Sequence, residues 1–287
     1  MVMTIAQMQH FKDAGVSGIV ELVSKSFPLT TRTRVVETRG NLINVPVITE
    51  DISGSWRPEN VGKPNSGYKS ITVPVKMAFL DCSYFLDEQV AKSHPISIDA
   101  ACATAAESAM RGAMKSLEEA AFHGAGTDGD IFKGLDQSVT NVVDAGGTGD
   151  VTDAYIINDA AVSLFVAGGN LFEAGEIQKT QVSDSTGVFW AYSQNLSFYA
   201  ALCAVNTFGI ARVKNISATK KLTDDHIFEA MSKMDASYPP SAIYLSTTGV
   251  RHLQIARSQV SITGAPAPIP TEVSLVPVYV SSAIAVL

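Results

Sequence analysis

Residues 96–135 read ISIDAACATAAESAMRGAMKSLEEAAFHGAGTDGDIFKGL, and this stretch decides the fold. Ser97 or Asp99 can accept hydrogen bonds from the free amides of a first helical turn. We expect Gly124 to end the helix, because glycine readily adopts the left-handed conformation that follows many helices. Between these signals lie about 26 residues, which make about 39 Å of helix at about 1.5 Å per residue. The pattern therefore predicts one long helix that acts as a spine.

The two faces of the predicted spine helix differ in polarity. Charged side chains share one face on a helical wheel: Glu107, Arg111, Lys115, Glu118 and Glu119. Apolar and mostly small side chains fill the other: Cys102, Ala106, Ala109, Met110, Ala113, Met114, Leu117 and Ala121. Ion pairs four residues apart on the charged face add a few tenths of a kcal/mol each, or roughly 0.2–0.5. So many alanines on the buried side allow a sheet or another backbone to approach closely.

The composition of the whole chain limits the classes of function that it could have. Only 17% of the 287 residues are charged, against about 25% in a typical globular protein. A low charge with many small residues suggests that much of the surface is covered, most simply by other copies of the chain. The net charge of −7 and the pI of about 5.2 argue against a dedicated nucleic-acid binder. They are compatible with a protein that encloses nucleic acid.

The cysteines and the N-terminus indicate the compartment. Cys82, Cys102 and Cys203 are far apart and lie in apolar patterns, so we expect buried free thiols in a reducing environment, not metal ligands or a redox pair. The first residues lack the pattern of a signal peptide. No apolar run approaches the 18 or so residues that span a bilayer. We expect a cytosolic protein where it is made, with no membrane contact.

A projecting hairpin is predicted before the spine helix. Residues 4–24 have helical apolar spacing and are expected to form an N-terminal arm that needs a partner surface. From residue 32 to 90 the period changes to two, with Pro46 in the outgoing leg and Pro74 in the return leg. Proline is confined to sheet edges, so neither leg is a central strand. Trp56 and Tyr68 near the turn suggest that the hairpin lies on a neighbouring molecule; the alternative is an ordinary surface hairpin.

The second half of the chain alternates short helices and strands. Residues 141–149 are a flexible connection and a candidate boundary, and residues 264–270 are an extended linker. The helices are expected at 153–166, 222–234 with Thr223 as cap, and 247–259 with Ser246 as cap. The strands are expected at 187–193, 197–205, 208–214, 242–245, 276–280 and 283–287. The fold class is α+β.

In this order the elements resemble the major capsid proteins of tailed phages, the HK97-like fold. The resemblance rests on the arm and long hairpin, on the spine helix with its glycine-rich loop, and on two later segments. These are the helix DDHIFEAMSKM, which leads into AIYLSTTGVRHLQIARS, and the strand VPVYV at 276–280. In many relatives a strand group like VFWAYSQNLSFYAALCAV follows the PV-containing strand. In this sequence the group comes before the helix DDHIFEAMSKM.

The resemblance implies a division of the chain and a set of sites. It implies an N-terminal arm (1–31), an extended loop hairpin (32–90), a peripheral domain with the spine helix (91–145, completed by strands at about 271–287) and an axial domain (146–270). The intersubunit contacts of the extended loop would be Trp56, Arg57, Lys63, Tyr68 and Lys69. The spine-helix end and glycine loop would be Gly124, Gly126, Gly129, Gly134 and Leu135.

The function implied is that of a shell subunit. Copies of the chain would assemble into pentamers and hexamers of an icosahedral head that encloses double-stranded DNA without sequence-specific binding. Portal, scaffold and decoration proteins would be partners, and the protein would reside in the virion after assembly in the host cytoplasm. Some relatives join subunits by a lysine–asparagine isopeptide bond, for which Lys63 or Lys69 could be donors. An encapsulin-like compartment and an α+β enzyme are the alternatives.

Motifs for catalysis do not fit their structural context. Residues 124–129, GAGTDG, match the dinucleotide fingerprint, but that site needs a strand before the glycines and a helix after them. Here a helix precedes them. Asp128 and Asp130 could bind a cation, although such carboxylates are usually solvated. The five histidines are scattered, and we expect no enzyme activity, cofactor or metal.

Overall fold

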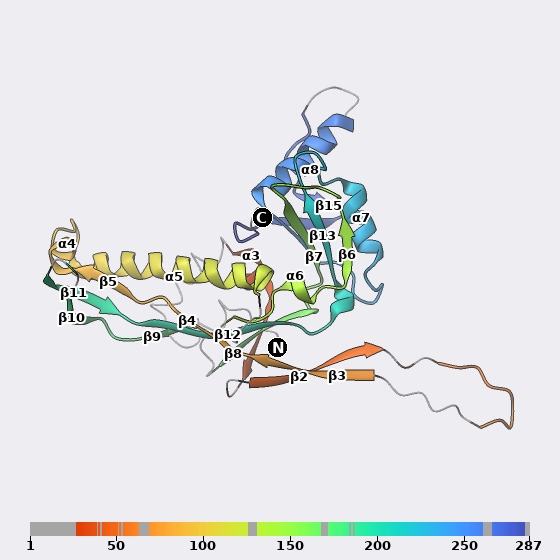
Figure 1. The fold of residues 1–287 in the computed structure, drawn as a ribbon, viewed down its shortest axis with the longest axis horizontal. Helices are drawn as coiled ribbons and strands as arrows, with labels where there is room; N and C mark the ends of the chain where they lie inside the picture. The colour runs from red at the N-terminus through yellow and green to blue at the C-terminus, as the bar shows by residue number, and fades with distance from the viewer. Residues whose placement is uncertain are drawn as a thin grey trace.

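The computed structural model describes residues 27–38, 40, 42–50, 52, 54–62, 69–125, 131–167, 172–183, 185, 187–260 and 266–284. Most of the predicted N-terminal arm lies outside the described residues, as do residues 63–68 of the hairpin tip and 126–130 of the glycine loop. Figure 1 shows an elongated part built along one long helix, a sheet-and-helix body at the end of that helix, and a projecting hairpin.

The predicted spine helix is confirmed as α5, Ile98–His123, with 26 residues. It begins where Ser97 Oγ accepts a hydrogen bond from the amide of Ala100, at 3.1 Å. Its apolar stripe is buried together with a mixed sheet in the order β1–β8–β12–β4, in which β9 also pairs with β12. The strands of this sheet are β1 (Arg34–Thr38), β4 (Ala78–Asp81), β8 (Val162–Ala167), β9 (Phe172–Ala174) and β12 (Leu196–Ala204).

A second, smaller sheet lies near the start of α5. Its order is β10–β11–β5, with β5 at Tyr84–Asp87, β10 at Gln178–Ser183 and β11 at Val188–Gln194. The short helix α4 (Glu88–Lys92) follows β5 directly, and Asp87 caps it by accepting from the amide of Gln89 at 2.6 Å. Helix α5 therefore has strands beneath it along its length (Figure 1).

Gly124 ends α5 as predicted, but the expected conformational reason is wrong. Its φ of −56° and ψ of 125° are not left-handed. Close backbone contact is the reason: a Cβ on Gly124 would lie 2.2 Å from the carbonyl oxygen of Phe132, and one on Gly134 would lie 2.4 Å from the nitrogen of Gly124. The amide of Gly134 donates to the Gly124 carbonyl at 2.8 Å. The two glycines therefore allow two backbone segments to lie in direct contact at the end of the helix.

Glu118 does not lie on an exposed charged face, contrary to the prediction. Its side chain is 0% exposed, because α3 (Pro28–Arg32) and the residues that follow β16 (Val276–Val280) cover this part of α5. The ion pairs predicted between residues four apart on α5 are present. Arg111 contacts Glu107 at 2.9 Å and Lys115 contacts Glu119 at 3.5 Å.

The hairpin prediction is confirmed only for residues 42–76, because residues 34–38, 78–81 and 84–87 of the predicted legs pair with strands of the other two sheets beneath α5. Strands β2 (Leu42–Glu50) and β3 (Lys69–Lys76) form a two-stranded antiparallel sheet, with Pro46 opposite Thr72 and Pro74 opposite Asn44. The inward-facing Val45, Val47 and Val75 join the main core. Figure 1 shows the hairpin continuing away from the rest of the chain. The prolines therefore lie in strands that pair with no third strand.

The helix predicted at residues 153–166 is wrong. The chain forms strand β7 (Thr152–Ile157), a turn at Asn158–Ala161, and strand β8. The amide of Ala161 donates to the Asn158 carbonyl at 2.8 Å and closes the turn. All six residues of β7 are buried. A strand covered on both faces lacks the alternation of polar and apolar residues that would have identified it.

The body at the end of α5 is a six-stranded sheet in the order β15–β16–β14–β7–β13–β6. The further strands are β6 (Asn141–Asp144), β13 (Ile210–Ile216), β14 (Ala242–Leu245), β15 (Glu272–Val273) and β16 (Val276–Val280). Helices α7 (Asp224–Ser232) and α8 (Thr247–Val260) flank it. Thr223 and Ser246 cap them as predicted, accepting from the amides of His226 and Gly249.

The chain passes between the two bodies more often than the sequence predicted. Strands β8–β12 fall within the predicted second domain (146–270), yet they pair with β1, β4 and β5 beneath α5. Strands β15 and β16 were expected to complete the spine-helix domain, but they belong to the six-stranded sheet. Ala283 and Ile284 form no strand, and residues 285–287 lie outside the described part. Pairings between distant segments, which no local pattern encodes, explain these differences.

Alanine substitutions at two glycines test the account of the helix end. Gly124→Ala is expected to destabilise the protein by about 1–3 kcal/mol, because the atoms in the way belong to the backbone. Gly112→Ala is the matched control: it lies inside α5 with nothing within 4 Å of the added Cβ, so a gain of about 0.5–1 kcal/mol is expected. Chemical denaturation followed by circular dichroism measures both. Similar effects at the two positions would contradict the account.

Candidate functional site

The far part of the hairpin presents large apolar side chains to solvent. Trp56 is 104% exposed, and Ile52, Val61 and Ile71 are exposed as well. Among the predicted contact residues, Arg57 donates a hydrogen bond to the Val61 carbonyl, and Lys69 begins β3 with its side chain exposed. Lys63 and Tyr68 lie outside the described residues. Trp56 is thus an aromatic side chain with no cover from its own chain.

A second exposed apolar group, which the sequence reasoning missed, lies at the opposite end of the elongated part. It surrounds α4 and comprises Phe85, Val90, Ile96, Val188 and Trp190. Lys179 lies over the Trp190 ring at 5.4 Å and also contacts Glu88 at 2.8 Å. Figure 1 shows α4 and β11 at one extreme of the molecule and the hairpin at the other. The aromatic residues of β5 and β11 were the available signal.

The predicted glycine loop is a structural junction. Gly134 precedes α6 (Leu135–Ser138), and Leu135 is completely buried. Ala125 and Lys133 form an isolated antiparallel bridge across the loop. Gly126 and Gly129 lie outside the described residues. Gly124, Gly134 and Leu135 fix where the chain leaves the spine helix and enters the six-stranded sheet.

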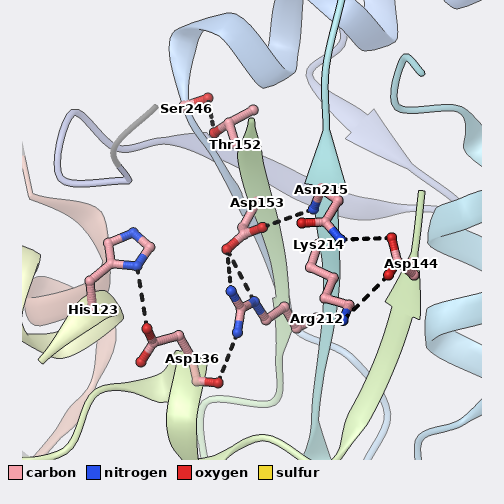
Figure 2. Close-up of polar contacts among 9 residues, drawn as sticks. All are labelled: His123, Asp136, Asp144, Thr152, Asp153, Arg212, Lys214, Asn215 and Ser246. Atoms are coloured by element: carbon pink, nitrogen blue, oxygen red, sulfur yellow. Dashed lines mark hydrogen bonds and ion pairs between the residues drawn. The ribbon is translucent and has the colours of Figure 1, made fainter. Parts of the chain in front are cut away.

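A buried polar cluster lies at this junction, as Figure 2 shows. Arg212 of β13 donates to Asp153 Oδ2 from Nε at 3.1 Å and from Nη2 at 2.6 Å, and its Nη1 donates to the Asp136 carbonyl at 2.8 Å. The amide of Asn215 donates to the other Asp153 oxygen at 3.3 Å. His123 Nδ1 lies 3.8 Å from Asp136 Oδ2. One guanidinium therefore joins β7, β13 and α6.

Burial dominates the electrostatics of the cluster. It lowers the pKa of His123, even though Asp136 and Asp153 act in the opposite direction. It raises the pKa of Tyr155, whose ring lies below the Arg212 guanidinium at 5.8 Å. Both ring nitrogens of His123 and the Tyr155 hydroxyl are buried without a hydrogen-bond partner. The neutral form of His123 is therefore favoured at pH 7.

The cluster has the wrong geometry for nucleophilic catalysis. The hydroxyls of Thr152 and Ser246 lie 2.8 Å apart, but Thr152 precedes Asp153 in β7 and its side chain points to the other face of the sheet. Figure 2 shows Thr152 and Ser246 paired at one end of the strand, with no dashed line from them to His123 or Arg212. No group of three His, Cys, Asp or Glu side chains in the described ranges could hold a metal ion. The arrangement ties secondary-structure elements together.

The remaining sequence predictions concern cysteines and membranes. Cys102 and Cys203 are buried free thiols as expected, whereas Cys82 is half-buried. Burial raises the pKa of Cys82 and Cys203 to about 11, so both thiols are protonated at neutral pH. Within the part of the chain that the structure describes, no helix is long and apolar enough to cross a bilayer.

Two charge deletions on strand β13 test the role of the cluster. Arg212→Met leaves Asp153 buried and unpaired, which is expected to cost about 3–5 kcal/mol. Lys214→Met is the matched control, because Lys214 contacts Asp144 at 3.3 Å on the exposed surface and such pairs contribute roughly 0–1 kcal/mol. Urea denaturation provides both values. Equal losses of unfolding free energy in the two variants would show that Arg212 does not stabilise the junction.

No protein-family model matches this sequence, and no curated protein matches it either. Solved structures do match its fold. A chain of bacteriophage Epsilon15 is 16% identical, with a TM-score of 0.60 over 88% of this chain and 86% of that one. The capsid chain of bacteriophage JBD30 is 10% identical, with a TM-score of 0.54 over 96% and 94%. With its long hairpin, spine helix and terminal six-stranded sheet, this chain has the HK97-like fold.

Proposed function

We propose that this chain is a major capsid protein, the shell subunit of a tailed-phage head. The observation that carries the proposal is the likeness of the fold, over 96% of the chain, to a subunit of the JBD30 capsid. The subunits would form pentamers and hexamers of an icosahedral shell around double-stranded DNA. A net charge of −7 suits a container for DNA better than a protein that grips the phosphate backbone.

The exposed surfaces support self-assembly. An isolated two-stranded hairpin is marginal in water, and the outer part of β2–β3 exposes Ile71 with Trp56 beyond it. The other apolar group, around Phe85 and Trp190, lies at the far end of the molecule. When one copy's hairpin covers another copy's distal surface, both apolar groups are buried. Such a head-to-tail contact joins different patches and generates rings when its rotation closes.

The two bodies have distinct roles in this proposal. The elongated part along α5 would be the peripheral domain, and the six-stranded sheet with α7 and α8 would be the axial domain near the five- and six-fold axes. The N-terminal arm and the hairpin would reach over neighbouring subunits. Portal, scaffold and decoration proteins would complete the head in the host cytoplasm. Many repeated weak contacts, each reversible, then determine the geometry of the product.

Trp56 provides the test of the proposal. Trp56→Ala is expected to reduce assembly at least about tenfold, because an exposed tryptophan at an interface commonly contributes 2 kcal/mol or more, or roughly a factor of 30. The melting temperature of the unassembled chain should not change, since the Trp56 side chain is fully exposed. Sedimentation velocity and negative-stain electron microscopy of the chain expressed alone measure assembly.

Trp190→Ala is the contrasting variant. The Trp190 ring is half covered by its own chain, with Lys179 above it, so its loss should lower the melting temperature of the unassembled chain. A wild-type chain that stays a compact, protease-resistant monomer at all concentrations would overturn the shell proposal. If Trp56→Ala assembles as well as the wild type, the hairpin is not a contact between subunits.

A further inference from the structure

Among the described residues, one buried carboxyl group belongs neither to the exposed apolar surfaces nor to the junction cluster. Glu118 lies in the last third of α5, on the side where α3 and the chain after β16 meet it. Figure 1 shows α3 and the C-terminal end of the chain beside this end of the helix. Glu118 therefore lies where three distant segments of the sequence converge.

The carboxyl group of Glu118 is hydrogen-bonded to two of these segments. Ser281 Oγ donates to Oε1 at 2.6 Å. Thr30 Oγ1 lies 3.4 Å from Oε2, and its single hydrogen is shared with the Phe27 carbonyl at 3.1 Å. The amides of Leu29 and Thr30 also donate to the carboxyl group. These amides belong to the first turn of α3, where Phe27 provides no side-chain cap. Glu118 thus caps α3 from another part of the chain, and Thr30 and Ser281 are both completely buried.

We propose that Glu118 is a proton-controlled latch, which holds α3 and residues 281–284 against the spine helix when its carboxyl group is neutral and loosens them when it ionises. Among the described residues no cation forms an ion pair with Glu118, which is completely buried. An ionised carboxylate in such a site loses its hydration, and opening the joint restores water to it. The neutral acid avoids this loss of hydration, although the hydrogen bonds donated to the carboxyl group favour its ionised form. Since β1 and the hairpin follow α3, the latch controls the attachment of the hairpin's root.

The neighbouring charges leave Glu118 as the titrating group of the joint. Tyr244 of β14 faces it, and burial raises the pKa of this tyrosine so far that it stays neutral. Arg32, in the last turn of α3, donates to Asp159 at 2.6 Å and to the Tyr279 hydroxyl at 2.7 Å. One end of α3 is thus held by the Arg32 contacts and the other by the carboxyl group of Glu118.

The direction of the pH effect follows from linkage. Burial raises the pKa of Glu118 to about 7, and the hydrogen bonds from Ser281, Thr30 and Leu29 act against this rise. A folded-state pKa above the value of 4.5 in the open chain means that the closed joint binds the proton more tightly. The stabilisation is therefore complete below about pH 4.5 and is lost as the pH rises through 7.

Hydrogen exchange of the full chain, read by mass spectrometry from pH 5 to 8.5 and corrected for intrinsic rates, tests the latch. Protection of peptides that contain Thr31, Thr33 and Ser281 should fall at least about tenfold between pH 5 and 7, since opening is linked to release of one proton. Ile227 in α7 provides an internal reference. If protection at α3 and Ser281 in the wild type does not change with pH, the latch proposal is wrong.

Matched variants identify the group. Glu118→Gln should flatten the profile, whereas Glu119→Gln, next to it but exposed and paired with Lys115, should leave it as in the wild type. Ser281→Ala removes a hydrogen bond that favours the ionised form, so the midpoint should move to higher pH. A Glu118→Gln profile that still falls, or a Ser281→Ala midpoint that does not move, would overturn the proposal.

Discussion

The buried stripe of α5 is the constraint on which the rest of the structure depends. A helix of 26 residues cannot remain stable in water with such an apolar face uncovered, and its alanines allow backbones to come close. Met110, Met114 and Phe122 fill the larger spaces against the strands and β7. Segments from nearly every part of the sequence reach this stripe, including α3 near the start and Ile284 near the end.

The end of α5 holds the two bodies together with polar groups. Arg212 joins the six-stranded sheet to α6, and Glu118 joins the helix to α3 and Ser281. Buried polar contacts are strong only when their partners are correctly placed, so they select one arrangement of the packed elements. The same end also carries Gly124 and Gly134, where only hydrogen atoms fit between backbones. The junction is therefore specific as well as stable.

Much of the fold could be predicted because its signals are local. Ser97, Thr223 and Ser246 cap helices as their positions indicate, and Pro46 with Pro74 identified a hairpin without further strands. The failures concern residues whose state depends on distant parts of the chain. Strand β7 is buried on both faces, so it showed no alternation.

Glu118 and the junction cluster illustrate the same limit. On a helical wheel Glu118 falls beside Glu119 and Lys115, and nothing nearby in the sequence shows that α3 and Ser281 cover it. Arg212, Asp153 and Asp136 are far apart along the chain, so their convergence required the sheet topology. The aromatic residues of β5 and β11 were visible in the sequence, but only the structure shows which of them stay exposed.

Electron cryomicroscopy of the assembled chain tests the central claim most directly, because it shows what covers the hairpin. The account predicts closed or ring-shaped particles of identical subunits in which Trp56 and the outer part of β2–β3 contact a neighbouring copy. Particles in which the hairpin lies on its own subunit, or a chain that forms no particles at all, would contradict it.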